Sequence, residues 1–344
     1  MIKRTIKKIF PAKFSSEQMS NITGLASGNQ HNFFFVHIPK TAGTSFRTSF
    51  EKSIFTYKDY GNNSSSSSDD VKRYVYEDND LYGFKKRFNE HQGLWITGHV
   101  NLVKYINFVP ISHTIAFVRE PLKQVLSHYN HYVRHHNYQG GLSDFLDKPY
   151  AKSLQSRHLN FMPLSLIGCL GITEHYDQSL ALINQQFDLN LPSEKVNINN
   201  SKHFTDESLD DVLNDKFEKN NVQDIAMYKE ALFLHTQRMD LNAENKTWTY
   251  GCTGINPNNV LHGCAFQYDC DDAISLVVHM NNKPIKTIVA NGFYAAYSKA
   301  NFPRERYVGF HFPLPKNVSK DDSIDVYVEG TGQKLNLKTL RIKK

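Results

Sequence analysis

Residues 37–47 read HIPKTAGTSFR and follow directly on the apolar run NFFFV. A short aromatic and β-branched run that stops at a proline is typical of a buried strand. The pattern then changes, because Phe46, Phe50 and Ile54 lie four residues apart and so share one face of a helix. We therefore expect a strand over residues 33–38, then a polar turn, then a helix.

The polar turn carries a lysine, a glycine and several hydroxyl side chains, namely Lys40, Thr41, Gly43, Thr44 and Ser45. Backbone N–H groups and the helix dipole at a helix start point at an anion, and a glycine lets the backbone approach it closely. The lysine precedes the glycine, unlike the nucleoside-triphosphate loop GxxxxGK[ST], which disfavours magnesium-dependent phosphoryl transfer. Taken alone, the turn is read equally well as a phosphate cradle or as a plain helix start.

A second unit of the same kind begins with an apolar strand over residues 114–118, followed by Arg119 and by Pro121, which suits the first turn of a helix. The apolar residues of that helix recur at intervals of three and four: Leu122, Val125, Leu126, Tyr129, Tyr132 and Val133. Ser127 follows Arg119 by about two turns, so a guanidinium fork and a hydroxyl can converge on a second phosphate. The alternative is a salt bridge from Arg119 to Glu120 or another neighbour.

Two strands that each end in a basic residue before a helix predict an α/β fold, a parallel sheet flanked by helices whose ligands collect beyond the carboxyl ends of the strands. Apolar spacing from about 142 to 240 indicates helices that cover this sheet. After residue 250, short alternating runs separated by turn residues predict an all-β, sandwich-like domain. The expected organisation is a basic N-terminal segment (1–30), a catalytic domain (31–249) with a mobile serine-rich loop (60–70), and a β-sandwich accessory domain (250–344).

The charge and hydropathy of the chain limit the kinds of ligand and location that we expect. The chain has 40 Lys and Arg against 34 Asp and Glu, a net charge of +6, and no long basic run. This favours an anionic ligand over a nucleic acid, because duplex binders concentrate their positive charge on one face. No apolar stretch approaches the roughly 20 residues that span a bilayer. The N-terminus also lacks the apolar core of a secretory signal, so we expect a cytoplasmic protein.

The four cysteines form no CxxC pair and are too few for a disulfide scaffold, which fits a reducing compartment. Zinc ligands could in principle be assembled from Cys252, His262, Cys264 and Cys270. Scattered cysteines in a strand-rich segment are more often core or surface thiols. We therefore expect no metal.

The stretches FFFVHIPKTAGTSFR and IAFVREPLKQVLSHY together resemble the two nucleotide-binding signatures of the carbohydrate sulfotransferases, the group of heparan sulfate 2-O- and 6-O-sulfotransferases and many bacterial relatives. Weaker similarities are SLQSRHL (153–159), GITEHYDQSLALI (171–183) and NINNSKH (197–203). The resemblance covers roughly residues 32–240. It departs at Gln124, where many relatives have arginine.

The resemblance implies a P-loop-like sheet and the sulfate donor 3′-phosphoadenosine 5′-phosphosulfate, PAPS. Its first motif would bind the 5′-phosphosulfate through Lys40, Thr41, Ala42, Gly43, Thr44 and Ser45. Its second would bind the 3′-phosphate through Arg119 and Ser127, and Arg157 is a further nucleotide or acceptor contact. Lys40 would also stabilise the charge that develops on the leaving group.

Family members carry a catalytic histidine in a segment like WITGHVNL (95–102), so the resemblance nominates His99 as the base that deprotonates the acceptor hydroxyl. An imidazole with an ordinary pKa near 6.5 can accept a proton at neutral pH. A lone histidine after an apolar run is otherwise more often structural.

Other clusters have plainer readings. Four histidines on the helix after Arg119 (His128, His131, His135, His136) lack a carboxylate or cysteine partner, and a solvated face or an acceptor contact explains them. Aromatic residues of the β domain, such as Phe293, Tyr294 and Tyr297, either pack or stack on sugars.

The sequence thus predicts a bacterial, cytoplasmic sulfotransferase that uses PAPS to sulfate a carbohydrate hydroxyl on a polysaccharide, oligosaccharide or glycolipid. In-line displacement requires positioning and charge stabilisation rather than a metal. Two alternatives remain open: a nucleotide-dependent phosphotransferase, and a catalytically silent glycan-binding protein on the same fold.

Overall fold

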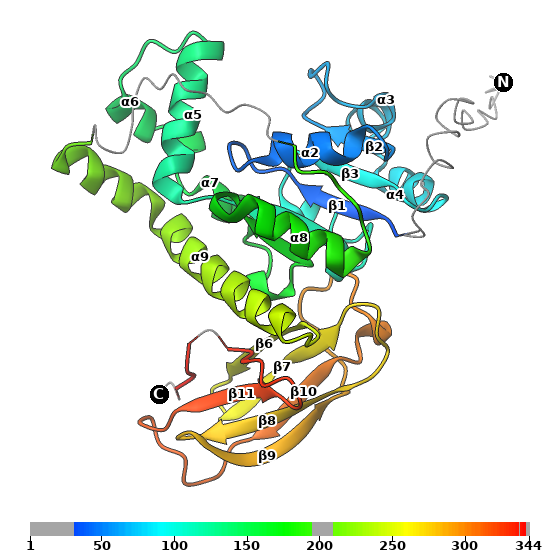
Figure 1. The fold of residues 1–344 in the computed structure, drawn as a ribbon, viewed down its shortest axis with the longest axis vertical. Coiled ribbons are helices and arrows are strands. Elements are labelled where there is room, and N and C mark those ends of the chain that lie inside the picture. Colours follow the sequence, from blue (N-terminus) through cyan, green and yellow to red (C-terminus); the bar gives the residue numbers. More distant parts are fainter. Residues whose placement is uncertain (1–30, 195–208, 337, 342–344) are drawn as a thin grey trace, which may run out of the picture.

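The computed structural model describes residues 31–194, 209–336 and 338–341. The basic segment 1–30 and the similarity at 197–203 lie outside the described residues. Figure 1 shows an α/β part stacked above an all-β part, with the long helix α9 running from one to the other. Among the described residues, no helix combines the length and the apolar character needed to cross a membrane.

The α/β part is built on a five-stranded sheet whose paired strands all run parallel in the order β2-β3-β1-β4-β5. Its strands are β1 (Phe33–Val36), β2 (Thr56–Asp59), β3 (Trp95–Gly98), β4 (Thr114–Val118) and β5 (Cys169–Ile172). The central strands β1, β3 and β4 are buried along their whole length, as expected for a parallel sheet covered on both faces. The predicted strand 114–118 is confirmed, and the predicted strand 33–38 ends two residues early.

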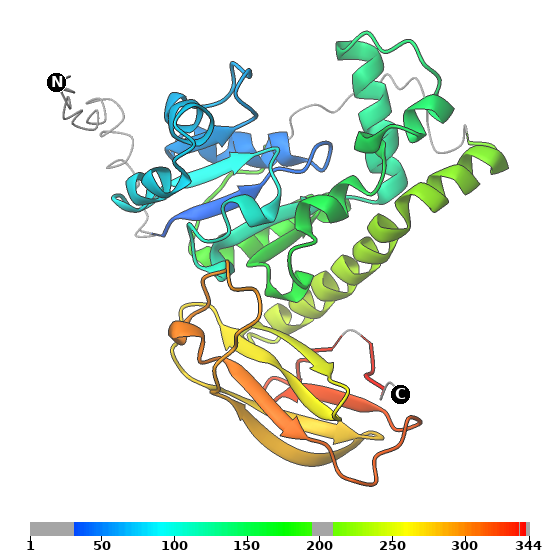
Figure 2. The same ribbon diagram turned by 180° about the vertical axis from the view of Figure 1, so that it is seen from behind.

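Helices cover both faces of this sheet (Figures 1 and 2). The α-helices are α2 (Gly43–Glu51), α3 (Asp69–Val71), α4 (Leu81–Asn89), α5 (Pro121–His135), α6 (Leu142–Leu146), α7 (Leu154–Leu159), α8 (Tyr176–Phe187) and α9 (Asp211–Ala243). Phe33 and Phe35 pack on α2 and α8, whereas Phe34 and Val36 pack on the opposite face. Alternate residues of β1 therefore belong to two separate cores.

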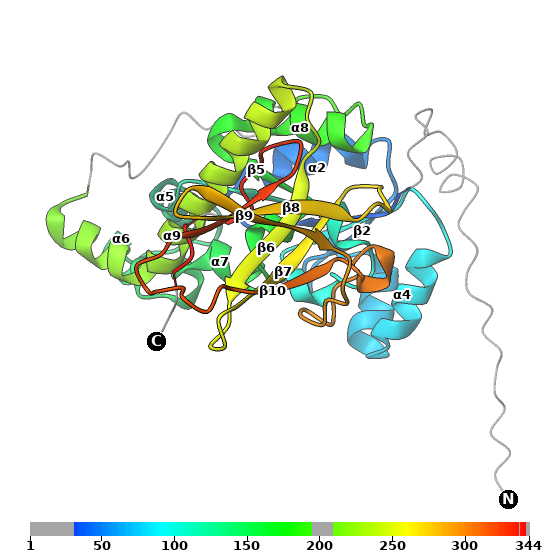
Figure 3. The same ribbon diagram turned by 90° about the horizontal axis from the view of Figure 1, so that it is seen from below.

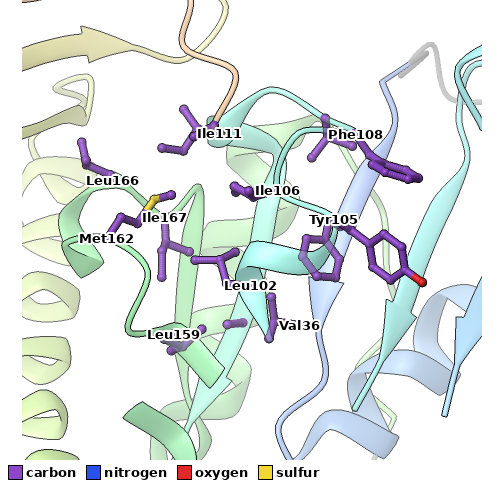
Figure 4. Close-up of a cluster of buried hydrophobic side chains, with 14 of the residues drawn as sticks. Val36, Leu102, Tyr105, Ile106, Phe108, Ile111, Leu159, Met162, Leu166 and Ile167 are labelled. Atoms are coloured by element: carbon purple, nitrogen blue, oxygen red, sulfur yellow. The ribbon is translucent and has the colours of Figure 1, made fainter. Parts of the chain in front are cut away.

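Figure 4 shows part of the second core, where Val36 of β1 lies among apolar side chains from the connections around β3, β4 and β5. The α5 helix has its own core with α6 and α9. The predicted apolar face of α5 is confirmed there, with Val125, Leu126 and Tyr129 buried and Leu122, Tyr132 and Val133 partly buried.

The serine-rich stretch 60–70 connects β2 to α3. Within this predicted loop, Ser67 is buried. Ser67 Oγ accepts a hydrogen bond from Tyr60 N at 2.9 Å and donates to Gly61 O at 2.7 Å. Ser68 Oγ likewise accepts from Lys58 N at 2.9 Å. These serines bond to backbone groups that no regular ladder satisfies.

The all-β part contains two antiparallel three-stranded sheets, β10-β7-β6 and β11-β8-β9. The strands are β6 (Thr249–Ile255), β7 (Val260–Gln267), β8 (Ile274–Met280), β9 (Lys283–Ala290), β10 (Gly309–Pro313) and β11 (Ile324–Val328). One hydrophobic core joins both sheets, which agrees with the sandwich-like expectation. Helix gives way to strand between Ala243 and Thr249.

The sheet β10-β7-β6 contributes to two cores. In β7, Leu261 and Ala265 point into the sandwich, while Cys264 and Phe266 belong to the same cluster as Phe34 of β1. Figure 3, seen from the β end, shows the small sheets lying across the α/β part. The all-β part is thus packed against the α/β part through a continuous apolar contact.

Candidate active site

Lys40 and Arg119 lie at the same edge of the sheet. They follow β1 and β4, which are neighbouring parallel strands. Arg119 Nη1 donates a hydrogen bond to Lys40 O at 3.2 Å, so the two predicted motifs meet in space. Arg119 Nε also lies 4.0 Å from Glu174 Oε1, so its carboxylate neighbour is Glu174 rather than Glu120.

The turn before α2 has an unusual backbone. Lys40 and Ala42 adopt left-handed φ values of 68° and 62°, which residues with a Cβ rarely do. Ala42 stands at the N-cap of α2 and offers no capping side chain. The first backbone N–H groups of α2 are consequently presented without a side-chain cap, which is the arrangement that favours an anion.

Side chains from other elements hold this turn. Thr41 is fully buried and its Oγ1 donates to Ile38 O at 3.0 Å, so its hydroxyl serves the turn itself. Gln124, the position at which the sequence departs from its relatives, is also buried, and its Nε2 donates to Pro39 O at 3.0 Å. Gln124 therefore has a structural partner here.

The side chain of His37 leaves no room for a Cβ at position 43, so this residue has to be glycine. A Cβ at this position would lie 2.1 Å from Cδ2 of His37, closer than any real contact. The sequence suggests that Gly43 lets the backbone approach a ligand closely. In the structure, the His37 ring gives a second reason for a glycine at this position. His37 lies three residues before Lys40 and was not among the predicted site residues.

His37 belongs to a small aromatic and polar cluster around His99. The ring centroid of His99 lies 4.7 Å from that of His37 and 4.8 Å from that of Tyr60, both edge-on. Tyr60 Oη accepts a hydrogen bond from Arg47 Nη1 at 3.0 Å and lies 2.9 Å from His37 Nδ1. Tyr60 and Arg47 could not be recognised from the sequence, because they come from a loop and a helix face.

Electrostatics keeps both imidazoles neutral at pH 7. The His99 side chain retains an exposed face, yet the surrounding protein excludes enough water to lower its pKa to about 4, helped by positive charge at His158 and Arg47. Burial is the main cause that puts the pKa of His37 well below its usual value, and the neighbouring His99 and Arg47 act in the same direction. A neutral His99 has a lone pair available to accept a proton.

Lys40 lies in a cationic environment. Its pKa is lowered by burial and by the positive charges of Arg119 and Arg134. The same lysine lowers the pKa of His131 on α5 to about 4, after burial as the main cause. Lys40, Arg119 and Arg134 thus gather positive charge beside this turn, which a bound polyanion would stabilise.

The backbone of Arg119 is linked to α9 through α7. Gln155, fully buried on α7, accepts from Arg119 N at 2.8 Å and donates to Arg119 O at 2.9 Å. Asp224 of α9 accepts from the backbone N–H groups of Gln155 and Ser156 at 3.0 and 2.7 Å. The SLQSRHL stretch thus contributes Gln155, which orients the backbone of Arg119.

The remaining predicted residues are less connected. Ser127 is half-buried on α5, and its hydroxyl has no hydrogen-bond partner among the described residues. Arg157 is exposed and donates to Pro149 O. Of the four histidines on and just after α5, His128 is buried among the rings of Tyr132, Phe145 and Tyr150, so it does not lie on a solvated face.

The hypothetical zinc ligands are not assembled together. Cys252 and Cys264 are neighbours, but His262 and Cys270 are not part of that contact. Within residues 31–194, 209–336 and 338–341, no group of three or more His, Cys, Asp or Glu side chains could hold a metal.

These observations define a class: an α/β protein with an uncapped helix start after one strand and a histidine of lowered pKa after its neighbour, both at the carboxyl ends of its parallel strands. The chain belongs to the sulfotransferase family, whose sequence model matches residues 27–231, more than half of its length. The protein is therefore an enzyme of sulfuryl transfer. No curated protein matches the sequence closely enough to be named as a relative.

Proposed function

We propose that this sulfotransferase transfers a sulfuryl group from PAPS to a hydroxyl of a carbohydrate, by in-line displacement with His99 as the base. The observation that carries the proposal is the uncapped start of α2 beside Lys40 and Arg119, with a neutral His99 at the same strand ends. The acceptor is proposed as a polysaccharide, oligosaccharide or glycolipid.

The described residues fit such a donor. The backbone N–H groups at the start of α2, with Lys40, Thr44 and Ser45, would hold the 5′ end, and Arg119 with Ser127 would hold the 3′-phosphate. The positive charges that lower the pKa of Lys40 support this assignment, because a polyanion would offset their repulsion. When bound, the donor supplies a sulfuryl group already activated by its phosphate leaving group.

Each step of the proposed chemistry can be assigned to a residue of the site. His99 would accept the proton of the acceptor hydroxyl, and the edge-on His37 and Tyr60 rings limit the directions its imidazole can take. Lys40 would stabilise the negative charge that develops on the bridging oxygen. The hydrogen bond from Arg119 to Lys40 O positions this lysine while Arg119 also faces the 3′ end.

The two alternative functions are less well supported. A phosphotransferase lacks its GxxxxGK[ST] loop here and does not agree with the family. A silent glycan-binding protein would have no need of Lys40, His99, Arg119 and Ser127 together.

Ligand-dependent melting tests the donor. We expect 3′-phosphoadenosine 5′-phosphate to raise Tm without magnesium, because a ligand that binds only the folded state stabilises it. ATP with magnesium is the matched comparison. Stabilisation by ATP with magnesium and none by the bisphosphate would sink the proposal.

Replacement of the base tests the mechanism. His99→Ala is expected to lower kcat by about 10²- to 10⁴-fold and to leave the affinity for 3′-phosphoadenosine 5′-phosphate unchanged. His311→Ala, an exposed histidine of β10, is the control and should turn over normally. Normal turnover by His99→Ala in a radiolabelled sulfate-transfer assay on a glycan panel would remove His99 from the mechanism.

A further inference from the structure

Two cysteines of the all-β part are direct neighbours. Cys252 on β6 and Cys264 on β7 face each other in the antiparallel register, and their sulfur atoms lie 3.7 Å apart. Paired residues of antiparallel strands have Cα atoms about 4.5 to 5.5 Å apart, within the roughly 4.4 to 6.8 Å that a disulfide spans. Side-chain rotation can therefore join the two sulfur atoms without moving the strands apart.

The two thiols differ in access. Cys264 is completely buried, whereas Cys252 is partly exposed. Cys252 lines a groove of about 1330 Å³ between α9 and the end of the all-β part, together with residues such as Met227 and Leu335. A small molecule in the groove can contact the Cys252 sulfur, and the buried Cys264 can react with it only after Cys252 has done so.

The two thiols also differ in acidity. Hydrogen bonding from Cys264 lowers the pKa of Cys252, and the Tyr294 hydroxyl, 3.3 Å from Cys252 Sγ, acts in the same direction. Burial raises the pKa of Cys264, so Cys264 keeps its proton as the donor. Cys252 is thus the better nucleophile of the pair, because the thiolate is the reactive form.

We propose that Cys252 and Cys264 form a reactive dithiol that low-molecular-weight disulfides such as glutathione disulfide oxidise to a Cys252–Cys264 disulfide. The Cys252 thiolate attacks one sulfur of glutathione disulfide, forms a mixed disulfide and displaces one glutathione thiolate. Cys264 then loses its proton and attacks the Cys252 sulfur, which releases the second glutathione. Two protein thiols lose two electrons and two protons, and one glutathione disulfide becomes two glutathione thiols.

The other two cysteines serve as internal comparisons. Cys169 is buried in the parallel sheet, and burial raises its pKa. Cys270 is partly exposed, but the group bonded to its sulfur is Asp272 N, at 3.4 Å, and not a second thiol. Neither residue combines access with a neighbouring thiol, so the reaction is specific to the pair.

The test uses the full chain, reduced and then incubated with glutathione disulfide, acid-quenched and analysed by intact mass and peptide mapping. We expect the protein to lose the mass of two hydrogen atoms and to yield a cross-linked peptide that contains Cys252 and Cys264. Cys264→Ser should stop at a glutathione adduct on Cys252, and Cys264→Ala, which adds no polar group to the buried site, should do the same. Cys252→Ser should form neither product at this pair.

Cys270→Ser is the matched control and should react like the unaltered chain. Any of three results would overturn the proposal: a cross-link between another pair, a stable glutathione adduct on Cys252 that Cys264 does not resolve, or no reaction at Cys252. None of these outcomes depends on the sulfotransferase activity.

Discussion

The two strand–turn–helix units of the sheet look alike in sequence and differ at the helix start. Both place a basic residue shortly before a helix, Lys40 three residues before the first residue of α2 and Arg119 two residues before that of α5. The α2 helix has no capping side chain, and its turn contains left-handed residues. The α5 helix begins with Pro121, and its Glu120 carboxylate accepts from Leu122 N and Lys123 N at 3.1 and 2.7 Å.

Because of this difference, we expect the starts of α2 and α5 to have different roles. The start of α2 has no side-chain cap, which favours an anion there, whereas the start of α5 is already occupied by a carboxylate and offers an anion only the side chains around it. The second unit instead supports the first, since Arg119 and Gln124 donate to the carbonyls of Lys40 and Pro39. A basic residue after a strand therefore does not by itself identify a backbone anion site.

Removal of the first unit's cation should have the largest effect. Lys40→Ala is expected to lower kcat for sulfate transfer by about 10²- to 10³-fold, because the charge that develops on the leaving group loses its stabilising partner. Lys123→Ala, an exposed lysine in the first turn of α5, is the control and should retain full activity. Equal rates for the two variants would erase the distinction between the units.

Removal of the second unit's cation should act on binding. Arg119→Ala is expected to weaken 3′-phosphoadenosine 5′-phosphate by about 1.5 to 3 kcal/mol in calorimetry, the contribution of a charge-assisted hydrogen bond. Adenosine 5′-phosphosulfate, which lacks the 3′-phosphate, should lose less affinity for the same variant. Identical losses for both ligands would mean that Arg119 acts only by holding Lys40 O.

Burial, followed by nearby positive charge, sets the pH dependence of His99. Its base form is lost as the pH falls through its pKa, which burial and nearby positive charge lower to about 4. An ordinary histidine is about nine-tenths protonated at pH 5.5, so kcat/KM would fall about tenfold there. We expect a fall of less than about twofold at pH 5.5, measured where the protein stays folded. An acidic limb near pH 6.5 would contradict the lowered pKa.

Removal of the α5 cap should have the smallest effect. Glu120→Ala is expected to lower the free energy of unfolding by about 1 kcal/mol, since two backbone N–H groups lose their acceptor. Urea denaturation gives this value, and affinity for 3′-phosphoadenosine 5′-phosphate should stay unchanged. A marked gain in that affinity would show that α5 also binds anions once its carboxylate is gone.

Local patterns predicted much of the fold. The apolar run before Pro39 and the run 114–118 correspond to β1 and β4, and the strands predicted after residue 250 are present as β6 to β11. Strand order and register were beyond reach, because β1 pairs with β3 and β4, both of which lie more than 50 residues further along the chain. Such pairings depend on the whole core rather than on a local pattern.

Only part of the site could be predicted, again because some of its contacts join segments that lie far apart in the sequence. The resemblance supplied Lys40, Arg119 and His99 because they stand in short motifs. His37, Tyr60 and Gln155 act through contacts between segments far apart in sequence, and no single-sequence pattern distinguishes such residues from ordinary core or loop positions. His37 did offer one signal, since it adjoins the turn that the motif defines.

The stretch that this protein shares with its family ends at residue 231, in the middle of α9. The next turns of that helix carry Arg238, a buried side chain whose Nη1 donates to Gly168 O at 3.0 Å, beside Tyr250 of β6. A chain cut at residue 231 would lose this contact and expose the apolar face that β7 covers. The stretch that the family model matches is therefore shorter than the unit that packs together.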